Sequence, residues 1–322
     1  MIILVLNCGS SSLKYQLLDM KNDEVYDLLA KGLVERIGME VGCLTHQTIG
    51  KDKVVKEMPI SDHTVGIQAV MDALLDKETG VLSSLEDIEA VGHRVVHGAE
   101  EFVCSQLITD AVIAQLEKCS VFAPLHNPAN ILGIRAVSAV LPSVPQVGVF
   151  DTAFHQTMPS YAYMYALPYE YYEKYGIRRY GFHGTSHKYV SAKGAKFAGV
   201  DLEYSKIITC HLGNGSSITA VHNGKSVDTT MGFTPLEGVT MGTRCGNIDP
   251  EVVIYLQEKE GLTPAEMSKV LNKKSGLLGL SCVSSDGRDI SAAANEGNEK
   301  AKLALKKLTS TSRSSSVPMR PR

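Results

Sequence analysis

The chain has 322 residues, of which 44% are hydrophobic, and its formal net charge at pH 7 is −3. A chain of this length and apolar content can bury large cores and is expected to form two domains. The small net charge provides no general basic field, so the composition does not indicate non-specific binding of nucleic acid. Any site for an anion must therefore be local.

Seven cysteines are scattered through the sequence without a Cys-x-x-Cys pair, which predicts reduced thiols rather than a disulfide framework or a zinc site. The amino terminus has no basic segment, and its apolar run is too short for a secretory signal. No run of about 18 apolar residues occurs that could cross a membrane. These features predict a cytoplasmic protein with no membrane partner and no nucleic-acid partner.

The first half of the sequence alternates strand-like with helix-like segments. Strands are predicted at 2–6, 13–19, 90–96 and 146–150. Helices are predicted at 65–76 and 110–118. A third helix is predicted to begin with Asn127 as its N-cap and Pro128 at its first position. This alternation predicts α/β layering.

The second half continues the α/β pattern. A helix near 186–197 and a strand from Lys206 precede Asn223-Gly224, a pair that favours the positive φ angles of a tight hairpin turn. Further helices are predicted at 250–259 and at 264–272, the latter capped by Thr263. Residues 309–322 contain no acidic residue and are rich in Ser, Thr, Arg and Pro, so this tail is predicted to be disordered.

One small polar turn occurs twice, as "LNCGSSSLKY" from Leu6 and as "LGNGSSITAV" from Leu212. Glycine lets main-chain N–H groups approach a phosphate, and serine hydroxyls add donors without bulk. Neither copy has the GxxxxGK[ST] pattern of a Walker A loop, and each copy alone could be a simple polar hairpin. Their repetition favours two phosphate-binding turns in two related domains.

Two arginines lie in stretches of glycine and β-branched residues, Arg94 in "VGHRVVHGAE" and Arg244 in "MGTRCGNIDP". A lone arginine is commonly a solvated surface group. A pair in such surroundings instead indicates anion ligands, because the guanidinium group matches the geometry of phosphate and carboxylate.

"RRYGFHGTSHKYV" brings two histidines, His183 and His187, to the start of a predicted helix. Free N–H groups and a nearby histidine make such a position a natural anion site. The alternative is that Thr185 or Ser186 simply caps the helix and that the histidines are packing residues. No GxSxG, HExxH or strand-associated GxGxxG pattern supports another type of catalytic site.

These segments resemble the acetate kinase family, in the order and at about the spacing found there. They are "LVLNCGSSSLKY", "GHRVVHG", "APLHNPAN", "VFDTAFHQTMP", "YGFHGTSHKYV", "HLGNGSSITAV", "DTTMGFTPLEGVTMGTRCGNIDP" and "SSDGRDI". The resemblance extends over roughly residues 1–305. It implies an α/β fold of duplicated ribonuclease H-like domains, as in actin, Hsp70 and sugar kinases, with a cleft between them. The domains would span residues 1–150 and 151–308, the second being incomplete.

The resemblance implies reversible in-line transfer of a phosphoryl group from ATP to acetate, giving acetyl phosphate and ADP. Mg²⁺ or Mn²⁺ would be the cofactor, ATP the co-substrate and a homodimer the assembly. Acetate is already ionised at pH 7, so the reaction requires no general base. Its difficulty is the repulsion between two anions, which positive charge and hydrogen bonds around a loose transition state would offset.

The resemblance also assigns roles to individual residues. The catalytic residues would be Arg94, Asp151, His183 and Arg244, the last two stabilising the transition state. Metal binding would involve Asn7 and Asp151, and His126 would be a supporting donor. Acetate would bind to Arg94 and to an apolar slot formed by Val96, Leu125, Phe182 and Pro235. The nucleotide phosphates would contact Ser10, Ser12, Lys14, His211, Leu212, Gly213, Asn214 and Gly215.

Valine at position 96 favours acetate over propionate, although one methylene contributes only about 1–3 kcal/mol. The family sequence continues with a glycine-rich adenosine loop and a "TNEE" segment that the 322 residues do not contain. A truncation or frameshift after about residue 305 is therefore expected, with weak or no turnover by this chain alone. Two alternatives stay open: a kinase for propionate or another short-chain carboxylate, and an inactive remnant that only binds carboxylate or phosphate.

Overall fold

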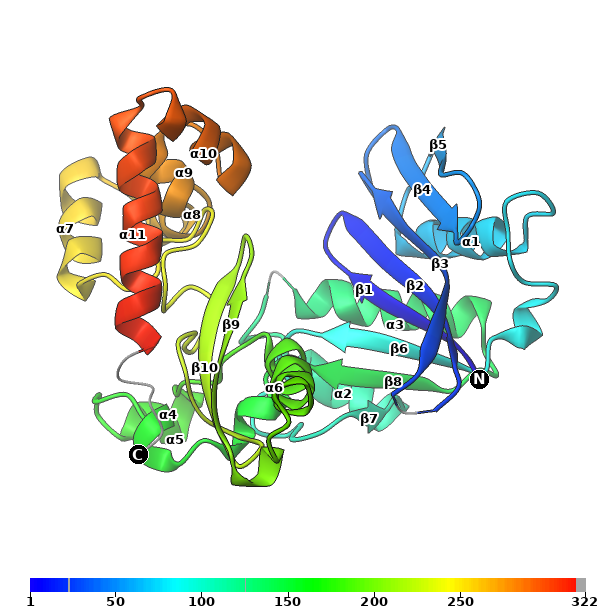
Figure 1. Ribbon diagram of the computed structural model, residues 1–322, viewed down its shortest axis with the longest axis horizontal. Helices are drawn as coiled ribbons and strands as arrows, with labels where there is room; N and C mark the ends of the chain where they lie inside the picture. The colour runs from blue at the N-terminus through cyan, green and yellow to red at the C-terminus, as the bar shows by residue number, and fades with distance from the viewer. Residues whose placement is uncertain (23, 125, 317–322) are drawn as a thin grey trace. The chain divides into compact units, whose positions relative to one another are not determined.

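The computed structural model describes residues 1–22, 24–124 and 126–316 and separates into two compact units (Figure 1). Unit 1 is Met1–Ala153 and unit 2 is Phe154–Arg322, a division close to the predicted boundary between residues 150 and 151. In the part of the chain that the structure describes, no helix combines the length and apolar character needed to cross a membrane.

Unit 1 is built on an eight-stranded sheet with the order β5-β4-β3-β2-β1-β6-β8-β7 (Figure 1). Its strands are β1 (Ile2–Cys8), β2 (Ser12–Met20), β3 (Tyr26–Glu35), β4 (Gly42–Thr48), β5 (Val54–Met58), β6 (Ala90–Val95), β7 (Gln106–Leu107) and β8 (Gln146–Phe150). The central strands β1, β6 and β8 run parallel, whereas β1 to β5 form an antiparallel meander. The carboxyl ends of β1, β6 and β8 therefore lie at one edge of the sheet.

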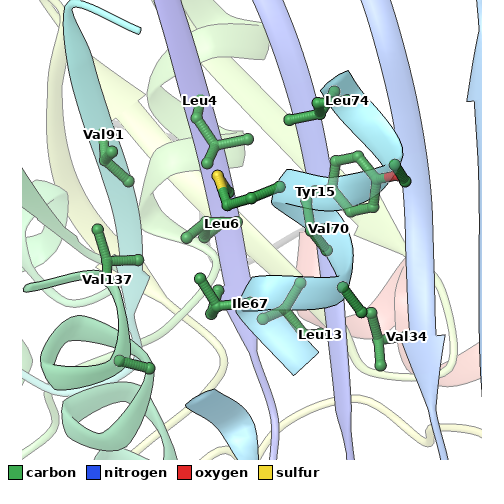
Figure 2. Close-up of a cluster of buried hydrophobic side chains, with 14 of the residues drawn as sticks. Leu4, Leu6, Leu13, Tyr15, Val34, Ile67, Val70, Leu74, Val91 and Val137 are labelled. Atoms are coloured by element: carbon green, nitrogen blue, oxygen red, sulfur yellow. The ribbon is translucent and has the colours of Figure 1, made fainter. Parts of the chain in front are cut away.

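The helices of unit 1 are α1 (His63–Leu75), α2 (Asp110–Cys119) and α3 (Asn127–Val140), with a short 3₁₀ turn at Leu85–Asp87. Alternation along β1 buries Leu4 and Leu6, which belong to the same core cluster as Ile67 of α1 and Val137 of α3 (Figure 2). Because successive side chains of a strand point to opposite faces, the intervening residue Val5 lies on the other face of the sheet. That face is the one available to polar residues of the same strands.

Unit 2 contains a three-stranded antiparallel sheet, β11-β10-β9. Its strands are β9 (Lys206–Leu212), β10 (Ser216–His222) and β11 (Lys225–Thr229). Its helices are α4 (Ser160–Tyr163), α5 (Glu170–Tyr175), α6 (Gly184–Ala198), α7 (Pro250–Glu260), α8 (Pro264–Lys273), α9 (Gly276–Ser281), α10 (Gly287–Asn295) and α11 (Glu299–Ser316), with 3₁₀ turns at Ala153–Thr157 and Leu202–Tyr204. The predicted hairpin is confirmed, since Asn223 and Gly224 have φ angles of 51° and 73°.

The structure differs from the sequence prediction at the starts of two helices. The N-cap of α3 is His126, and Asn127 is buried, where its amide exchanges hydrogen bonds of 3.1 and 2.8 Å with the backbone of His97. An amide used in this way does not cap its own helix. Helix α6 follows His183 in a left-handed conformation, so neither Thr185 nor Ser186 is its cap.

The carboxyl-terminal part also differs from the prediction. Residues 309–316, for which disorder was predicted, continue α11 in the structure. The hydroxyls of Thr309 and Thr311 donate to carbonyls one turn earlier, and Leu308 packs against the cluster of Leu277, Ile290, Ala294, Ala301 and Ala304. The composition of the tail concealed this packing. The remainder of that predicted segment, residues 317–322, lies outside the described residues.

We predict that Asn130→Ala loosens the carboxyl ends of β1 and β6. Asn130 is buried in α3, where its amide donates to the carbonyl of Cys8 (2.7 Å) and accepts from the N–H of Val96 (3.1 Å). Each backbone group left unsatisfied costs about 1–3 kcal/mol. Hydrogen exchange of peptides from these strands should report a loss of opening free energy of this size.

The control is Asn272→Ala, because among the described residues the partly exposed side chain of Asn272 bonds to Ser268 of its own helix α8. It should change exchange by no more than about 0.5 kcal/mol. Unchanged protection of β1 and β6 in Asn130→Ala would contradict the assigned role.

Candidate functional site

The first glycine-serine turn joins β1 to β2 as a hairpin. The N–H of Gly9 donates to the carbonyl of Ser12 at 2.7 Å, which closes the turn. The carbonyl of Gly9 accepts from Nε2 of His63 at 2.7 Å, so the start of α1 fixes the turn from outside. Ser10 is exposed at its tip. The turn is therefore a hairpin that hydrogen bonds hold in place, with small polar residues at its tip.

Three of the predicted residues of unit 1 line one pocket. Asn7 and Lys14 are register partners on β1 and β2, and they lie on the sheet face opposite the core. With Arg94 of β6 they line a pocket of about 630 Å³, together with Lys31 and Lys53. The described lining contains no acidic residue, so the pocket suits an anion.

Arg94 is fixed by Asp151 at the carboxyl edge of the parallel strands. Nε of Arg94 lies 3.1 Å from Oδ1 of Asp151, and Nη2 lies 2.6 Å from Oδ2. The Asp151 side chain is 3% exposed and that of Arg94 is 40% exposed. Burial opposes the charged form of Arg94, but the hydrogen bonds and charge of Asp151 outweigh it and raise its pKa. Asp151 thus keeps the guanidinium of Arg94 charged and oriented.

The predicted acetate slot and metal site of unit 1 are described only in part. Val96 follows β6 and is buried, with its N–H bonded to Asn130. Leu125 lies outside the described residues. Among the residues that the structure describes, no three His, Cys, Asp or Glu side chains are grouped to hold a metal ion. A metal held here would depend on few protein ligands.

The second turn is also a hairpin, closed by a different hydrogen bond. It joins antiparallel β9 and β10, and the N–H of Gly213 bonds to the carbonyl of Gly215 at 3.1 Å. Leu212 is exposed at the end of β9. A pocket of about 440 Å³ adjoins the turn and is lined by Leu212, Gly213, Asn214, Ser216, Met241, Gly242, Leu277, Ser285, Asp286, Gly287 and Leu308.

Gly215 brings His183 and Arg244 together. A Cβ added at Gly215 would lie 3.2 Å from Nη1 of Arg244 and 3.4 Å from Nε2 of His183, so both side chains border the same point of the turn. Nη1 of Arg244 also donates to the carbonyl of Pro235 at 3.2 Å. Four predicted residues of unit 2 thus lie together: Gly215, His183, Arg244 and Pro235. A bulkier residue at position 215 would clash with the side chains of His183 and Arg244.

Histidine rings surround this point. The ring of His183 stacks on that of His211 with 4.0 Å between centroids, and Nδ1 of His211 bonds to Oγ of Ser186 at 2.9 Å. His187 is buried, and burial, reinforced by neighbouring His155, His183 and His211, lowers its pKa to about 2. His187 is therefore neutral and buried. This agrees with the packing alternative given in the sequence analysis for the histidines here.

A clamp that the sequence analysis missed holds the loop carrying Pro235. Nη1 of Arg179 donates to the carbonyls of Thr229 (2.7 Å) and Thr230 (3.1 Å), and its Nη2 donates to Glu237 at 2.7 Å. The Tyr165 hydroxyl bonds to the same Glu237 carboxylate. Glu237 lies inside a segment that carried the family resemblance, and Arg179 directly precedes another, but a single charge does not identify its distant partner.

Comparisons with known proteins decide the family. The sequence profile of the acetokinase family matches residues 2–314. This chain belongs to the acetokinase family. The acetate kinases of Caldanaerobacter subterraneus subsp. tengcongensis and Thermoanaerobacter pseudethanolicus are each 62% identical to it over 307 residues, which span 95% of this chain and 76% of each relative.

Solved structures of the acetokinase family share the fold. The crystal structure of Porphyromonas gingivalis acetate kinase matches with a TM-score of 0.94 at 49% identity, covering 99% of this chain and 79% of that one. A propionate kinase from Francisella tularensis subsp. tularensis matches with a TM-score of 0.92 at 43% identity, with the same coverages. The predicted α/β fold class is confirmed.

Membership also establishes the reaction class. The chain is an acetate kinase by family, a phosphotransferase with a carboxyl group as acceptor (EC 2.7.2.1). The family uses ATP and acetate as substrates, and it implies a divalent metal. The roles of the individual residues remain predictions.

We predict that unit 2 loses stability as the pH falls below about 6.5. His155 is fully buried, and burial lowers its pKa to about 4 from an ordinary value near 6.5. The unfolded chain therefore takes up the proton first, and stability present above pH 6.5 is lost as the pH approaches 4. Between pH 7.5 and 5 this histidine should account for about 2 kcal/mol.

Urea unfolding followed by far-UV circular dichroism at both pH values measures this change. His155→Gln should reduce the pH dependence, whereas His222→Gln, at a partly exposed position at the end of β10, should leave it unchanged. An equal pH dependence in His155→Gln and the parent chain would refute the assignment.

Proposed function

We propose that the chain transfers the γ-phosphoryl group of ATP in line to an acetate oxygen, giving acetyl phosphate and ADP, with the reverse reaction using the same groups. The new P–O bond forms as the bond to the β-phosphate oxygen breaks. The observation that carries the proposal is the convergence of Arg244 and His183 on the glycine turn at Gly215. Positive charge and an N–H donor at one turn suit a phosphoryl group in transfer.

In unit 1, Arg94 binds the acetate carboxylate. Its orientation by Asp151 supports this role, since a guanidinium already held in place loses little freedom when it binds a second anion. We propose Val96 as the residue of unit 1 that borders the methyl group of acetate, while Leu125, Phe182 and Pro235 stay predictions for the same slot. Asn7, Ser10, Ser12 and Lys14 bind phosphate, a role supported for Asn7 and Lys14 by their shared acid-free pocket.

In unit 2, the second turn binds nucleotide phosphates. Its glycines expose main-chain N–H groups, and the adjoining pocket of about 440 Å³ has room for part of a nucleotide. His211, stacked on His183, supports that ring as a donor to the phosphoryl oxygens. Asp286 borders the same pocket and is a further candidate contact, although the sequence analysis quoted its motif without assigning it a role.

We propose Mg²⁺, or Mn²⁺ in its place, as the metal. The proposed donors fit a hard cation, because Asp151 and Asn7 offer oxygen atoms. Bound Mg²⁺ would neutralise phosphate charge. Asn7 and Asp151 lie at the ends of β1 and β8, two strand spacings or about 10 Å apart, so Asp151 would act through water and Asn7 near the phosphates.

Acetate is proposed as the preferred acid over propionate because Val96 is branched and buried. The match to a propionate kinase means that the fold itself does not make this distinction. We also propose a homodimer through unit 2, whose described surface exposes large apolar side chains such as Phe197, 94% exposed, and Tyr204, 84% exposed. The free cysteines agree with a cytoplasmic location.

The test is the effect of removing each arginine on acetyl phosphate formation. Arg244→Ala and Arg94→Ala should each lower kcat/KM for acetate by about 100- to 1,000-fold, measured by trapping the product with hydroxylamine. Arg135→Ala serves as the control, because Arg135 forms an exposed ion pair with Glu117 on the surface of unit 1. In the parent chain, kcat/KM for acetate should exceed that for propionate by about tenfold.

Activity retained within a fewfold of the parent rate in both arginine variants would contradict the proposed roles, and a parent chain without turnover would favour the inactive remnant. Preference for propionate in the parent chain would instead overturn only the assignment of the slot.

A further inference from the structure

Four side chains of unit 2 form a continuous line of hydrogen bonds that ends at His183. Oγ1 of Thr209 on β9 lies 2.7 Å from Nδ1 of His187 on α6. Nε2 of His187 lies 2.7 Å from Oγ of Ser217 on β10. The same Oγ lies 2.9 Å from Nδ1 of His183. Thr209, His187 and Ser217 are buried, so water does not replace these bonds.

The serine hydroxyl couples the two histidines. It has a single hydrogen but bonds to one nitrogen of each ring, so it donates to one ring and accepts from the other. Only two arrangements satisfy both bonds while the histidines are neutral. In the first, every donor points toward His183, whose own proton then lies on Nε2. In the second, every donor points toward Thr209, and the proton of His183 lies on Nδ1.

The Thr209 end of the line selects the first arrangement. There the Thr209 hydroxyl donates to Nδ1 of His187, which satisfies its hydrogen. In the second arrangement the hydroxyl would accept from His187, and its hydrogen would need another acceptor. Within the described part of the chain, Thr209 Oγ1 has no second partner. A buried hydroxyl with an unsatisfied hydrogen is disfavoured.

The charges around His183 favour its neutral form. The groups described as facing it include His187, which is neutral because of its burial, the stacked His211, and Arg244, which shares the border of Gly215. A positive imidazole beside the Arg244 guanidinium would be repelled. The tautomer of the neutral ring therefore decides whether Nε2 offers a hydrogen or a lone pair at the turn.

We propose that the line Thr209–His187–Ser217, here called the relay, holds neutral His183 with its proton on Nε2 and so makes Ser217 and His187 positioning residues for phosphoryl transfer. This inference rests on the proposed function for its catalytic consequence. A lone pair on Nε2 would repel the phosphoryl oxygens, whereas an N–H there donates to them. The relay thus supplies the correct donor before substrate binds.

The direct test is ¹⁵N NMR of the imidazole rings in the histidine-labelled chain at pH 7.5, with His183 assigned through His183→Gln. Protonated and bare ring nitrogens resonate far apart, so the spectrum reports the tautomer without any turnover. We expect the proton of His183 on Nε2 in the parent chain. Ser217→Ala should mix the two tautomers, and kcat should fall about 10- to 100-fold with little change in KM for acetate.

The matched control is Ser226→Ala. Ser226 is a buried serine of the same unit, and its hydroxyl bonds to Nδ1 of His155 at 2.8 Å. Its loss should alter the signals of His155 and leave the tautomer of His183 unchanged. If Ser217→Ala does not fold, Thr209→Val removes only the first donor of the relay at nearly constant volume and should also mix the tautomers.

The outcomes separate the relay from the proposed function. A proton on Nδ1 of His183 in the parent chain overturns the relay but leaves the phosphoryl transfer itself untouched. A tautomer that changes in Ser217→Ala while kcat stays constant overturns the catalytic role of the relay. Loss of both the Nε2 proton and kcat supports the inference.

Discussion

Electrostatic repulsion between a carboxylate and a phosphate is the constraint that organises this protein. Two anions react only if cations are held where the charges meet, and a cation on a mobile side chain loses much of its effect. In the proposed mechanism, Arg94 meets this demand through the parallel strands of unit 1. Because β6 and β8 are neighbours, Arg94 and Asp151 reach the same edge of the sheet, and the buried carboxylate orients the guanidinium.

Unit 2 meets the same demand in a different way. Arg244 is held by a backbone carbonyl, that of Pro235, and the loop containing Pro235 is held in turn by Arg179, Glu237 and Tyr165. Gly215 provides the space in which Arg244 and His183 approach each other. The lack of a side chain at Gly215 is therefore as important to this part of the candidate site as the charged side chains are.

The repeated turn shows what a sequence can reveal about a site. The polar hairpin and the phosphate turn do not exclude each other, because both copies are hairpins and both border a pocket, through Asn7 in unit 1 and Gly213 in unit 2. Local features of this kind were predictable. The hairpin at Asn223-Gly224 and the Thr263 cap of α8 were likewise predicted correctly, since each depends on neighbouring residues only.

Features that depend on distant partners were not predictable. Strand β5 was not predicted because it is an edge strand with little apolar alternation, whereas β4 was not predicted although burial alternates along it. Asn127 resembles a helix cap, but its amide is used by His97. The clamp at Glu237 and the relay through Ser217 each join residues that are tens of positions apart. No local pattern in the sequence marks such pairs.

Direct transfer in a single displacement is the central claim, and the stereochemistry at phosphorus tests it most directly. ATP made chiral at the γ-phosphorus with oxygen isotopes would be converted to acetyl phosphate, and the configuration of the product determined. One in-line displacement predicts inversion. Retention would require two displacements through a phosphorylated group of the protein and would contradict the account.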